Sequence, residues 1–484
     1  MTNVKSETLK GVKWSAVEKI TFQGLQFLIG LILARLLSPE DFGVIGMITI
    51  FIALSQSIID SGFANALIRK KDRTQEDYST VFYFNIIVGI ICYCILFFSA
   101  PWIADFFNTP ILKPVTRVVA VNLFISSLTI VQVAQFQINI DFKSLAKVTA
   151  VGALSGGFFG IILAYLGFGV WALVGQTVGG GLVRMVLIFC VSKWHPNRVF
   201  SKKSFRELFG YGSKIMLAGI IGTVYNHLTT LVIGKFYTSK DLGFYTRGSH
   251  FASLPSTLIT DVLGRVTFPI LAKLQDDTER LVSVYRKYIR STSFVVFFCF
   301  IILASIGHPL ILILLSEKWE PAVIYLQILC IAYLPDHISR INLNLLQVKG
   351  RSDLFLRLEI IKKTISCIIL FSSIPFGVMA ICLSKILYSV IALTINTYYT
   401  GKLFKMGIWM QAKDFLPYLI KTLIACAPGF IISLLDFSPY LQLLFGVMCG
   451  ITLYYLMNLH DSNFYEMKEI VLNVIKNRKI KNNL

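Results

Sequence analysis

Apolar residues occur in long runs of about twenty, and short polar segments separate one run from the next along almost the whole chain. An α-helix needs about 20 predominantly apolar residues to cross the hydrocarbon core of a bilayer, so each run predicts one membrane-spanning helix. We expect fourteen spans, roughly at residues 14–37, 42–66, 79–100, 112–137, 146–166, 170–192, 207–235, 247–272, 286–315, 321–346, 355–374, 377–400, 414–435 and 439–459. The pattern therefore predicts an all-α, polytopic membrane protein.

The composition supports this class of protein. Of the 484 residues, 55% are hydrophobic and 15% are charged, and the mean hydropathy is +0.69. A soluble chain of this length would carry more charge. The first run lacks the small-residue cleavage site of a signal peptide, so we expect it to remain as the first span.

Short motifs point away from metal and nucleotide chemistry. The nine cysteines all fall within apolar runs, and none has the spacing of a disulfide or zinc motif. We therefore expect no metal site. No G-x-x-x-x-G-K-[ST] sequence occurs, so ATP hydrolysis within this chain is not expected.

Small residues recur at a spacing that favours close helix packing. Gly152, Gly156 and Gly160 follow one another every four residues in the fifth span. This spacing brings small residues to one face, where a neighbouring helix can approach closely. We expect these glycines to pack against another span.

The net charge of +20 is unevenly distributed along the chain. With the N-terminus placed in the cytoplasm, most of the 46 Lys and Arg residues fall in cytoplasmic loops. This bias is the positive-inside pattern, so it predicts two cytoplasmic termini and does not indicate a nucleic-acid partner. It also keeps the eighth run as a span, although Pro255 interrupts it, because skipping that run would invert every later loop.

Residues 33–43 are echoed about 200 residues later by residues 233–243. Each copy ends an apolar run with a basic residue, passes through Ser or Thr to Asp-x-Gly, and enters a second run. The positions of interest are Arg35, Pro39, Asp41, Gly43, Asp241 and Gly243. Such a repeat predicts two like halves around a transport path. The charge pattern places both copies on the outer face, so we interpret them as hairpin or gate elements.

Charged side chains interrupt several predicted spans. The cations within spans are Lys19, Arg117, Arg184, Lys214, Arg265, Arg340, Lys385 and Lys421. Each would cost roughly 2.5–3.5 kcal/mol if it faced lipid at mid-bilayer. They cannot all face lipid, because the sum would exceed the stability of a typical protein, about 5–15 kcal/mol.

Polar residues also share helical faces. On the first span, Lys19, Gln23 and Gln26 lie on one face and Glu18 sits beside it. On the eighth span the grouped residues are Arg247, His250, Asp261 and Arg265, and pairs at i, i+4 elsewhere are Gln56 with Asp60 and Asp336 with Arg340. Any one pair could be a buried ion pair that joins helices, and His250 could be a structural histidine. The recurrence on several spans favours a hydrated central cavity.

Several stretches resemble a known family. Residues 33–43, Leu254-Pro255, and the segments 264–271 and 275–277 are similar to those of bacterial polysaccharide exporters of the Wzx type. These belong to the multidrug/oligosaccharidyl-lipid/polysaccharide superfamily, which also contains the MATE transporters. The resemblance implies a MATE-like fold of two pseudo-symmetric six-helix lobes around a central cavity. The implied parts are lobes at 1–200 and 201–413, two additional spans at 414–460 and a basic cytoplasmic tail at 461–484.

The resemblance also implies an activity. The chain would be a transporter, and not an enzyme, that flips an undecaprenyl-pyrophosphate-linked oligosaccharide across the bacterial inner membrane by alternating access. The expected cargo is an O-antigen, capsule or exopolysaccharide repeat unit, and the other expected partners are membrane lipids, a polysaccharide polymerase and chain-length machinery. We expect no cofactor, with proton or sodium coupling as an open question.

Candidate residues follow for each role. The substrate-binding candidates are Lys19, Lys214, Arg247, Arg265, Arg340, Gln23, Gln26 and Asn226. The ion-coupling candidates are Glu18, Asp60, Asp261, Asp336 and His250. Cations would neutralise the pyrophosphate, and amides would hydrogen-bond the sugars.

Two other functions remain as alternatives. The first is a MATE-type drug/cation antiporter, which would favour an acidic cavity, whereas the cations within these spans outnumber the acids. The second is a membrane-embedded polymerase or glycosyltransferase, which would need a larger loop outside the membrane than any found here. Both are weaker interpretations than the exporter.

Overall fold

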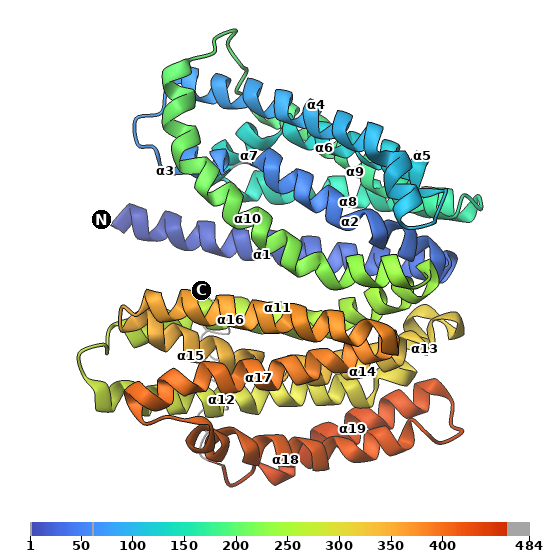
Figure 1. Cartoon of the computed structure of the whole chain (residues 1–484), viewed down its shortest axis with the longest axis vertical. Helices are drawn as coiled ribbons and strands as arrows, with labels where there is room; N and C mark the ends of the chain where they lie inside the picture. The colour runs from blue at the N-terminus through green and yellow to red at the C-terminus, as the bar shows by residue number, and fades with distance from the viewer. Residues whose placement is uncertain (1, 61, 462–484) are drawn as a thin grey trace, which may run out of the picture. The chain divides into compact units, whose positions relative to one another are not determined.

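The computed structural model describes the backbone of residues 2–60 and 62–461, and their side chains except at 2–13, 15–16, 257–266, 269 and 352. The tail expected over 461–484 lies, from residue 462 on, outside the described residues. Figure 1 shows the course of the chain.

The described chain is helical, and no strand occurs within it. The helices up to residue 236 are α1 (Thr2–Leu36), α2 (Pro39–Asp60), α3 (Phe63–Arg69), α4 (Gln75–Phe106), α5 (Leu112–Val119), α6 (Val121–Ser127), α7 (Ile130–Ile138), α8 (Phe142–Tyr165), α9 (Val170–Val191) and α10 (Lys202–Phe236). The later ones are α11 (Ser239–Ala272), α12 (Thr278–Ser305), α13 (Gly307–Leu315), α14 (Ala322–Tyr333), α15 (Asp336–Val348), α16 (Ser352–Ser373), α17 (Val378–Phe404), α18 (Ile408–Ile432) and α19 (Pro439–Met457).

Within the described residues, 11 helices are long and apolar enough to cross a membrane, or up to 12 if the bent pair Leu112–Ser127 and Ile130–Ile138 forms one span. A multi-pass, all-α membrane protein is therefore confirmed. The expected count of fourteen stays a prediction. The two remaining expected spans correspond to α11 and α16, whose charged residues lower their hydropathy.

The helix is interrupted within two of the expected spans. The run at 286–315 forms α12 and α13, and the run at 321–346 forms α14 and α15. Proline explains both breaks, because it has no amide hydrogen and favours the first turn of a helix. Pro309 lies in the first turn of α13, and Pro335 immediately precedes α15.

The chain forms two compact units, Met1–Thr246 and Arg247–Leu484. In the first unit, α8 packs along α9 and α1, and α10 packs along α2 and α3. In the second, α12 packs against α18 and α14, and α17 packs against α14, α15 and α16. The lobe boundaries expected near residues 200 and 413 stay predictions.

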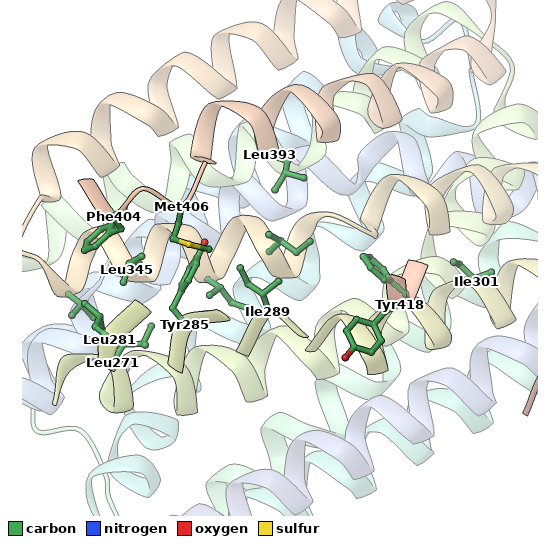
Figure 2. Packing of buried hydrophobic residues seen from close by; sticks show 14 of the residues in the cluster. Leu271, Leu281, Tyr285, Ile289, Ile301, Leu345, Leu393, Phe404, Met406 and Tyr418 are labelled. Carbon is green, nitrogen blue, oxygen red and sulfur yellow. The ribbon is translucent and has the colours of Figure 1, made fainter. Parts of the chain in front are cut away.

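The second unit has an apolar core around α12. Leu281, Tyr285 and Ile289 on this helix are fully buried against residues of α15, α17 and α18 (Figure 2). Polar groups are paired within it: the Tyr285 hydroxyl donates to Oδ1 of Asn342 at 2.9 Å, and the Asn342 amide donates to Oε1 of Gln411 at 2.9 Å. Buried polar groups satisfied in this way specify one packing of the helices.

A buried carboxylate joins α12 to α18. The Asp414 side chain is fully buried and accepts two hydrogen bonds from Arg286, each 2.8 Å long. Nε of Arg290 donates to the same carboxylate at 2.7 Å. Two arginines around one buried carboxylate compensate its desolvation and lock these two helices together.

The glycine series of the fifth expected span packs as expected. Gly156 on α8 meets Gly180 on α9, and a Cβ added at Gly156 would lie 3.0 Å from the Gly180 Cα and 2.5 Å from the Gln176 carbonyl oxygen. Gly152 and Gly160 also face α9. Small residues at these positions let the two backbones approach closely.

Replacing Gly156 by alanine should therefore lower the stability of the folded protein by about 1–3 kcal/mol, because the added methyl forces α8 away from α9. Thermal unfolding of the purified protein in detergent measures the effect. The matched variant Gly24→Ala adds the same methyl where nothing lies within 4 Å, so it should unfold like the wild type. Equal unfolding temperatures for the two variants would contradict the close approach.

Candidate functional site

The first unit contains a polar cavity of about 340 Å³ between α1, α6, α8 and α9. We call it the N-unit cavity. Gln26 of α1, Asn122 and Ser126 of α6, and Gln176 and Arg184 of α9 are among the residues that line it. A wall with amides, hydroxyls and one guanidinium is suited to a polar, anionic ligand.

Arg184 is the charged residue of the described cavity lining. Its Nε is buried and has no hydrogen-bond partner among the described protein atoms. Glu18 on α1 is close enough to interact electrostatically with the guanidinium. Arg184 as a whole is half-buried, but a buried donor without a partner is costly, and an oxyanion in the cavity would supply that partner.

A second unpaired group lies on the same wall. The Thr149 hydroxyl, which lines the cavity from α8, is buried and has no partner in the described part of the chain. Across the cavity wall, Nε2 of Gln176 lies 3.5 Å from Oε1 of Gln26. Hydroxyl and amide groups at these positions can donate to or accept from sugar hydroxyls.

A chain of hydrogen bonds runs from the cavity to Asp60. The Ser126 hydroxyl donates to Oε1 of Gln56 at 3.0 Å, and Nε2 of Gln56 donates to Oδ1 of Asp60 at 2.8 Å. The i, i+4 pair expected on the second span is therefore a real contact. It links an exposed carboxylate to a residue of the cavity wall.

Only some of the candidates on the first span lie at the N-unit cavity. Gln26 lines the cavity, and Glu18 interacts with Arg184. Gln23 is half-buried, and Lys19 is exposed; neither belongs to the described lining of the cavity. Their expected roles in substrate binding stay predictions.

The remaining candidates of the first unit lie on α10. Lys214 and Asn226 are both exposed on this helix and are not in the described cavity lining. Their expected roles in substrate binding also stay predictions.

The candidates of the second unit occupy different surroundings. Arg247 is half-buried, with its guanidinium carbon 6.0 Å from the centroid of the Trp319 ring, and His250 is exposed beside Phe251. Asp261 and Arg265 lie outside the described side chains.

A cluster of one acidic and three basic residues lies on α15, α16 and α17 of the second unit. Asp336 is half-buried on α15 and interacts electrostatically with Arg340, Lys362 and Lys385. Arg340 itself is exposed. The expected pair of Asp336 and Arg340 is thus part of a larger charged cluster, to which α16 contributes Lys362 and α17 contributes Lys385.

The two echoed segments form the same local structure. The Asp41 carboxylate accepts from the Ser38 hydroxyl at 2.7 Å, and the Ser38 hydroxyl accepts from the Asp41 amide at 3.2 Å. The equivalent bonds between Thr238 and Asp241 measure 2.6 and 3.1 Å. Each segment is therefore a reciprocal cap at the start of a helix, which explains the shared Ser/Thr-x-x-Asp spacing.

The two echoed segments also contact each other within the first unit. A Cβ added at Gly43 would overlap the carbonyl oxygen of Ser239, and one added at Gly243 would overlap the carbonyl oxygen of Pro39. The starts of α2 and α11 thus cross at two glycines in equivalent positions. Arg35 is exposed at the end of α1. A gating role for these hairpins stays a prediction.

Some residues of the cavity could not be selected from the sequence. Arg184 was recognisable only as one of several cations within spans, and Gln176 and Asn122 were not distinguished at all. The sequence does contain a weak indication that these residues act together, because Gln176, Gly180 and Arg184 follow one another every four residues and so share one face of α9.

The described residues offer no candidate metal site. No cluster of three or more His, Cys, Asp or Glu side chains among them could hold a metal ion.

A multi-pass helical bundle with a polar, cationic cavity is the architecture of a membrane transporter. The chain belongs to the polysaccharide biosynthesis protein family, whose match covers residues 32–324. It is similar to the lipopolysaccharide biosynthesis protein WzxC of Escherichia coli K12, with 25% identity over 370 residues and 74% of each chain covered. The expected family is confirmed.

Solved structures share the fold. The lipid II flippase MurJ, in an inward closed conformation, superposes with a TM-score of 0.72 at 15% identity, over 93% of this chain and 99% of that one. An inward-facing multidrug resistance MATE transporter superposes with a TM-score of 0.62 at 15% identity, over 85% and 99%. The expected class, an all-α polytopic membrane protein with a MATE-like fold, is confirmed, whereas the layout of two six-helix lobes stays a prediction.

Proposed function

We propose that this chain flips an undecaprenyl-pyrophosphate-linked oligosaccharide from the cytoplasmic to the outer leaflet of the bacterial inner membrane by alternating access. The cargo would be an O-antigen, capsule or exopolysaccharide repeat unit. The family, the likeness to WzxC and the fold of a lipid II flippase support this cargo class. The observation that carries the proposal is the N-unit cavity with half-buried Arg184 on its wall, whose Nε is buried and has no hydrogen-bond partner among the described protein atoms.

The cavity chemistry matches the headgroup. Arg184 would pair with a pyrophosphate oxygen, since a guanidinium forms strong, charge-assisted hydrogen bonds with phosphate. Gln26, Gln176 and Asn122 would hydrogen-bond sugar hydroxyls in the same space. The polyprenyl tail would remain in the bilayer, so that its apolar surface is never exposed to water.

Several further properties belong to this proposal. Both termini would face the cytoplasm, as the positive-inside bias predicts. The chain would act without catalysis and without a cofactor, and it would deliver its cargo to a polysaccharide polymerase and chain-length machinery. Transport would be coupled to a proton or sodium gradient.

Asp60 is the strongest candidate for coupling, because Gln56 connects it to the cavity wall. Replacing Asp60 by asparagine keeps an acceptor for Gln56 but removes the charge. We expect the basal rate to persist while an imposed ion gradient no longer accelerates flipping, a loss of about 5-fold or more for a typical coupling free energy. Flipping in vesicles with and without a gradient measures this. A full gradient response in the Asp60→Asn variant would exclude Asp60 from coupling.

A drug/cation antiporter is the alternative that the MATE likeness favours. Its cationic substrates would require an acidic site. The described lining of the N-unit cavity instead contains Arg184 and no acidic residue. The cavity charge therefore supports an anionic cargo.

Deletion of the gene distinguishes these functions in cells. The proposal predicts that a lipid-linked saccharide accumulates on the cytoplasmic face and that the mature polysaccharide disappears, without a change in drug sensitivity. Increased drug sensitivity with normal polysaccharide would favour the antiporter. Accumulation of single, already exported repeat units would favour a polymerase.

A further inference from the structure

The second unit carries a surface groove that shares no residue with the N-unit cavity. It has a volume of about 840 Å³ and lies where α16, the end of α17 and the start of α18 meet. Leu358, Ile361, Ile408 and Met410 are among its apolar residues. We call it the α16–α18 groove.

Three cations border this groove from three different segments. Arg357 comes from α16, Lys405 directly follows α17, and Lys413 comes from α18. The described lining contains no acidic residue. All three cations are exposed, and no ion pair joins them to a carboxylate among the residues the structure describes.

Acidic residues nearby in the sequence already have cationic partners. Asp353 pairs with Arg351 at 2.9 Å, and Asp414 is enclosed by Arg286 and Arg290. The groove therefore has a net positive charge and an apolar floor, a combination that suits an amphiphile with an anionic head.

Lys405 occupies a backbone conformation that usually belongs to glycine. Its φ is 58° and its ψ is 20°, in the left-handed region at the end of α17. A residue with a Cβ is disfavoured there, and helices commonly place glycine at this position. Hydrogen bonds from the Met406 amide to the Thr400 carbonyl, at 3.2 Å, and from Gln411 Nε2 to the Met406 carbonyl, at 2.7 Å, hold the turn. The lysine in this turn places its charge at the groove.

Aromatic residues mark the same place as a membrane interface. Trp409 is 83% exposed and Tyr398 is 63% exposed, and both line the groove. Exposed Trp and Tyr side chains concentrate at the level of lipid headgroups. The positive-inside bias assigns this end of the helices to the cytoplasm, where the leaflet is rich in anionic lipid.

We propose that the α16–α18 groove binds an anionic phospholipid of the cytoplasmic leaflet. Its phosphate would lie among Arg357, Lys405 and Lys413, and an acyl chain would lie along the apolar floor. Basic pockets between transmembrane helices on this side of a membrane are suited to such headgroups. The site goes beyond the flipping activity, because it holds a bilayer lipid and not the cargo.

Quenching of Trp409 fluorescence tests the proposal directly. The full-length protein is reconstituted in phosphatidylcholine bilayers with increasing amounts of brominated phosphatidylglycerol or brominated phosphatidylcholine, and Trp409→Phe identifies the signal of this tryptophan. We expect brominated phosphatidylglycerol to quench Trp409 at much lower mole fractions. Each of Arg357→Gln, Lys405→Gly and Lys413→Gln should weaken that preference about fivefold.

Two features keep this test specific. Lys405→Gly removes the charge while it suits the left-handed turn, so its unfolding temperature should not fall below that of the wild type. Lys402→Gln removes an equal charge from an exposed position on the last turn of α17, outside the groove lining, and should leave the preference unchanged.

Three results would overturn the assignment. Equal quenching by the two brominated lipids would mean that the groove does not select charge. An equal effect of Lys402→Gln and Lys405→Gly would mean a diffuse surface potential and no site. Displacement of phosphatidylglycerol by equimolar undecaprenyl pyrophosphate would assign the groove to the cargo lipid. None of these results depends on whether the chain flips an oligosaccharide.

Discussion

Replacing Arg184 by alanine is expected to reduce oligosaccharide flipping by about 30-fold or more. The reason is that removing one partner of a buried, hydrogen-bonded charge pair typically costs about 2–5 kcal/mol, and about 1.4 kcal/mol corresponds to tenfold in rate. In the proposed complex, the lost partner leaves a pyrophosphate oxygen without its cation inside the N-unit cavity. Flipping rates in vesicles, normalised to the amount of folded protein, measure the loss.

Two further variants separate binding from folding. Arg184→Lys keeps the charge but loses the planar donor set, so it should retain part of the activity. Arg117→Ala removes another cation of the first unit, one that lies over the Phe97 ring and outside the described cavity lining. It should flip at close to the wild-type rate. Wild-type activity in Arg184→Ala would exclude this arginine as a headgroup ligand.

Replacing Gly43 or Gly243 by valine is expected to prevent accumulation of folded protein. At each glycine, a Cβ would overlap a backbone carbonyl oxygen of the other hairpin, and a backbone atom cannot rotate away. Overpacking typically lowers folding stability by about 1–3 kcal/mol. Here the Cβ alone already overlaps the carbonyl oxygen, and the two methyl groups of valine add to that overlap. A loss of about 3 kcal/mol is a large part of a typical folding stability of about 5–15 kcal/mol.

Protein level and unfolding temperature in detergent measure this effect. Since the two contacts are reciprocal, the two variants should fail to a similar degree. Gly219→Val on α10 is the matched control, because nothing lies within 4 Å of a Cβ at that position. Normal folding of Gly43→Val would show that the two helix starts do not cross at these glycines.

The echoed hairpins illustrate what a sequence can and cannot reveal. The shared Asp-x-Gly spacing correctly indicated a repeated turn between two helices. The reciprocal cap follows from the same spacing, because Ser38 and Thr238 each stand three residues before their aspartate. The crossing of Gly43 with Ser239 could not be predicted, since no pattern within either segment specifies its partner.

The residues of the N-unit cavity could also be predicted only in part. Periodicity placed Gln26 on a polar face of the first span, and the structure puts it in the cavity wall. Arg184 was one of many intramembrane cations, and only the packing of α9 against α8 and α6 distinguishes it from exposed residues such as Lys19. Burial depends on neighbouring helices, so helix-by-helix patterns could not rank these cations.

The positions of helix breaks depend on individual residues such as proline, which the pattern of apolar runs does not reveal. The expected span at 321–346 was continuous in hydropathy, and Ala322–Val348 is still one candidate span, but Pro335 interrupts its helix between α14 and α15. The proline was visible in the sequence, but a membrane span can tolerate one when neighbouring groups satisfy the freed carbonyl. The surrounding helices therefore decide whether such a residue kinks a span or ends it.

Reconstitution of the purified chain tests the central claim most directly. Vesicles carry a fluorescent undecaprenyl-pyrophosphate-linked oligosaccharide in both leaflets, and a membrane-impermeant reagent destroys the label on the outside. With the wild-type chain, the account predicts that nearly all of the label becomes accessible, whereas vesicles with Arg184→Ala lose little more than the outer-leaflet fraction on the same time scale. If the wild-type chain exposes no more label than empty vesicles, this chain is not a flippase for that lipid.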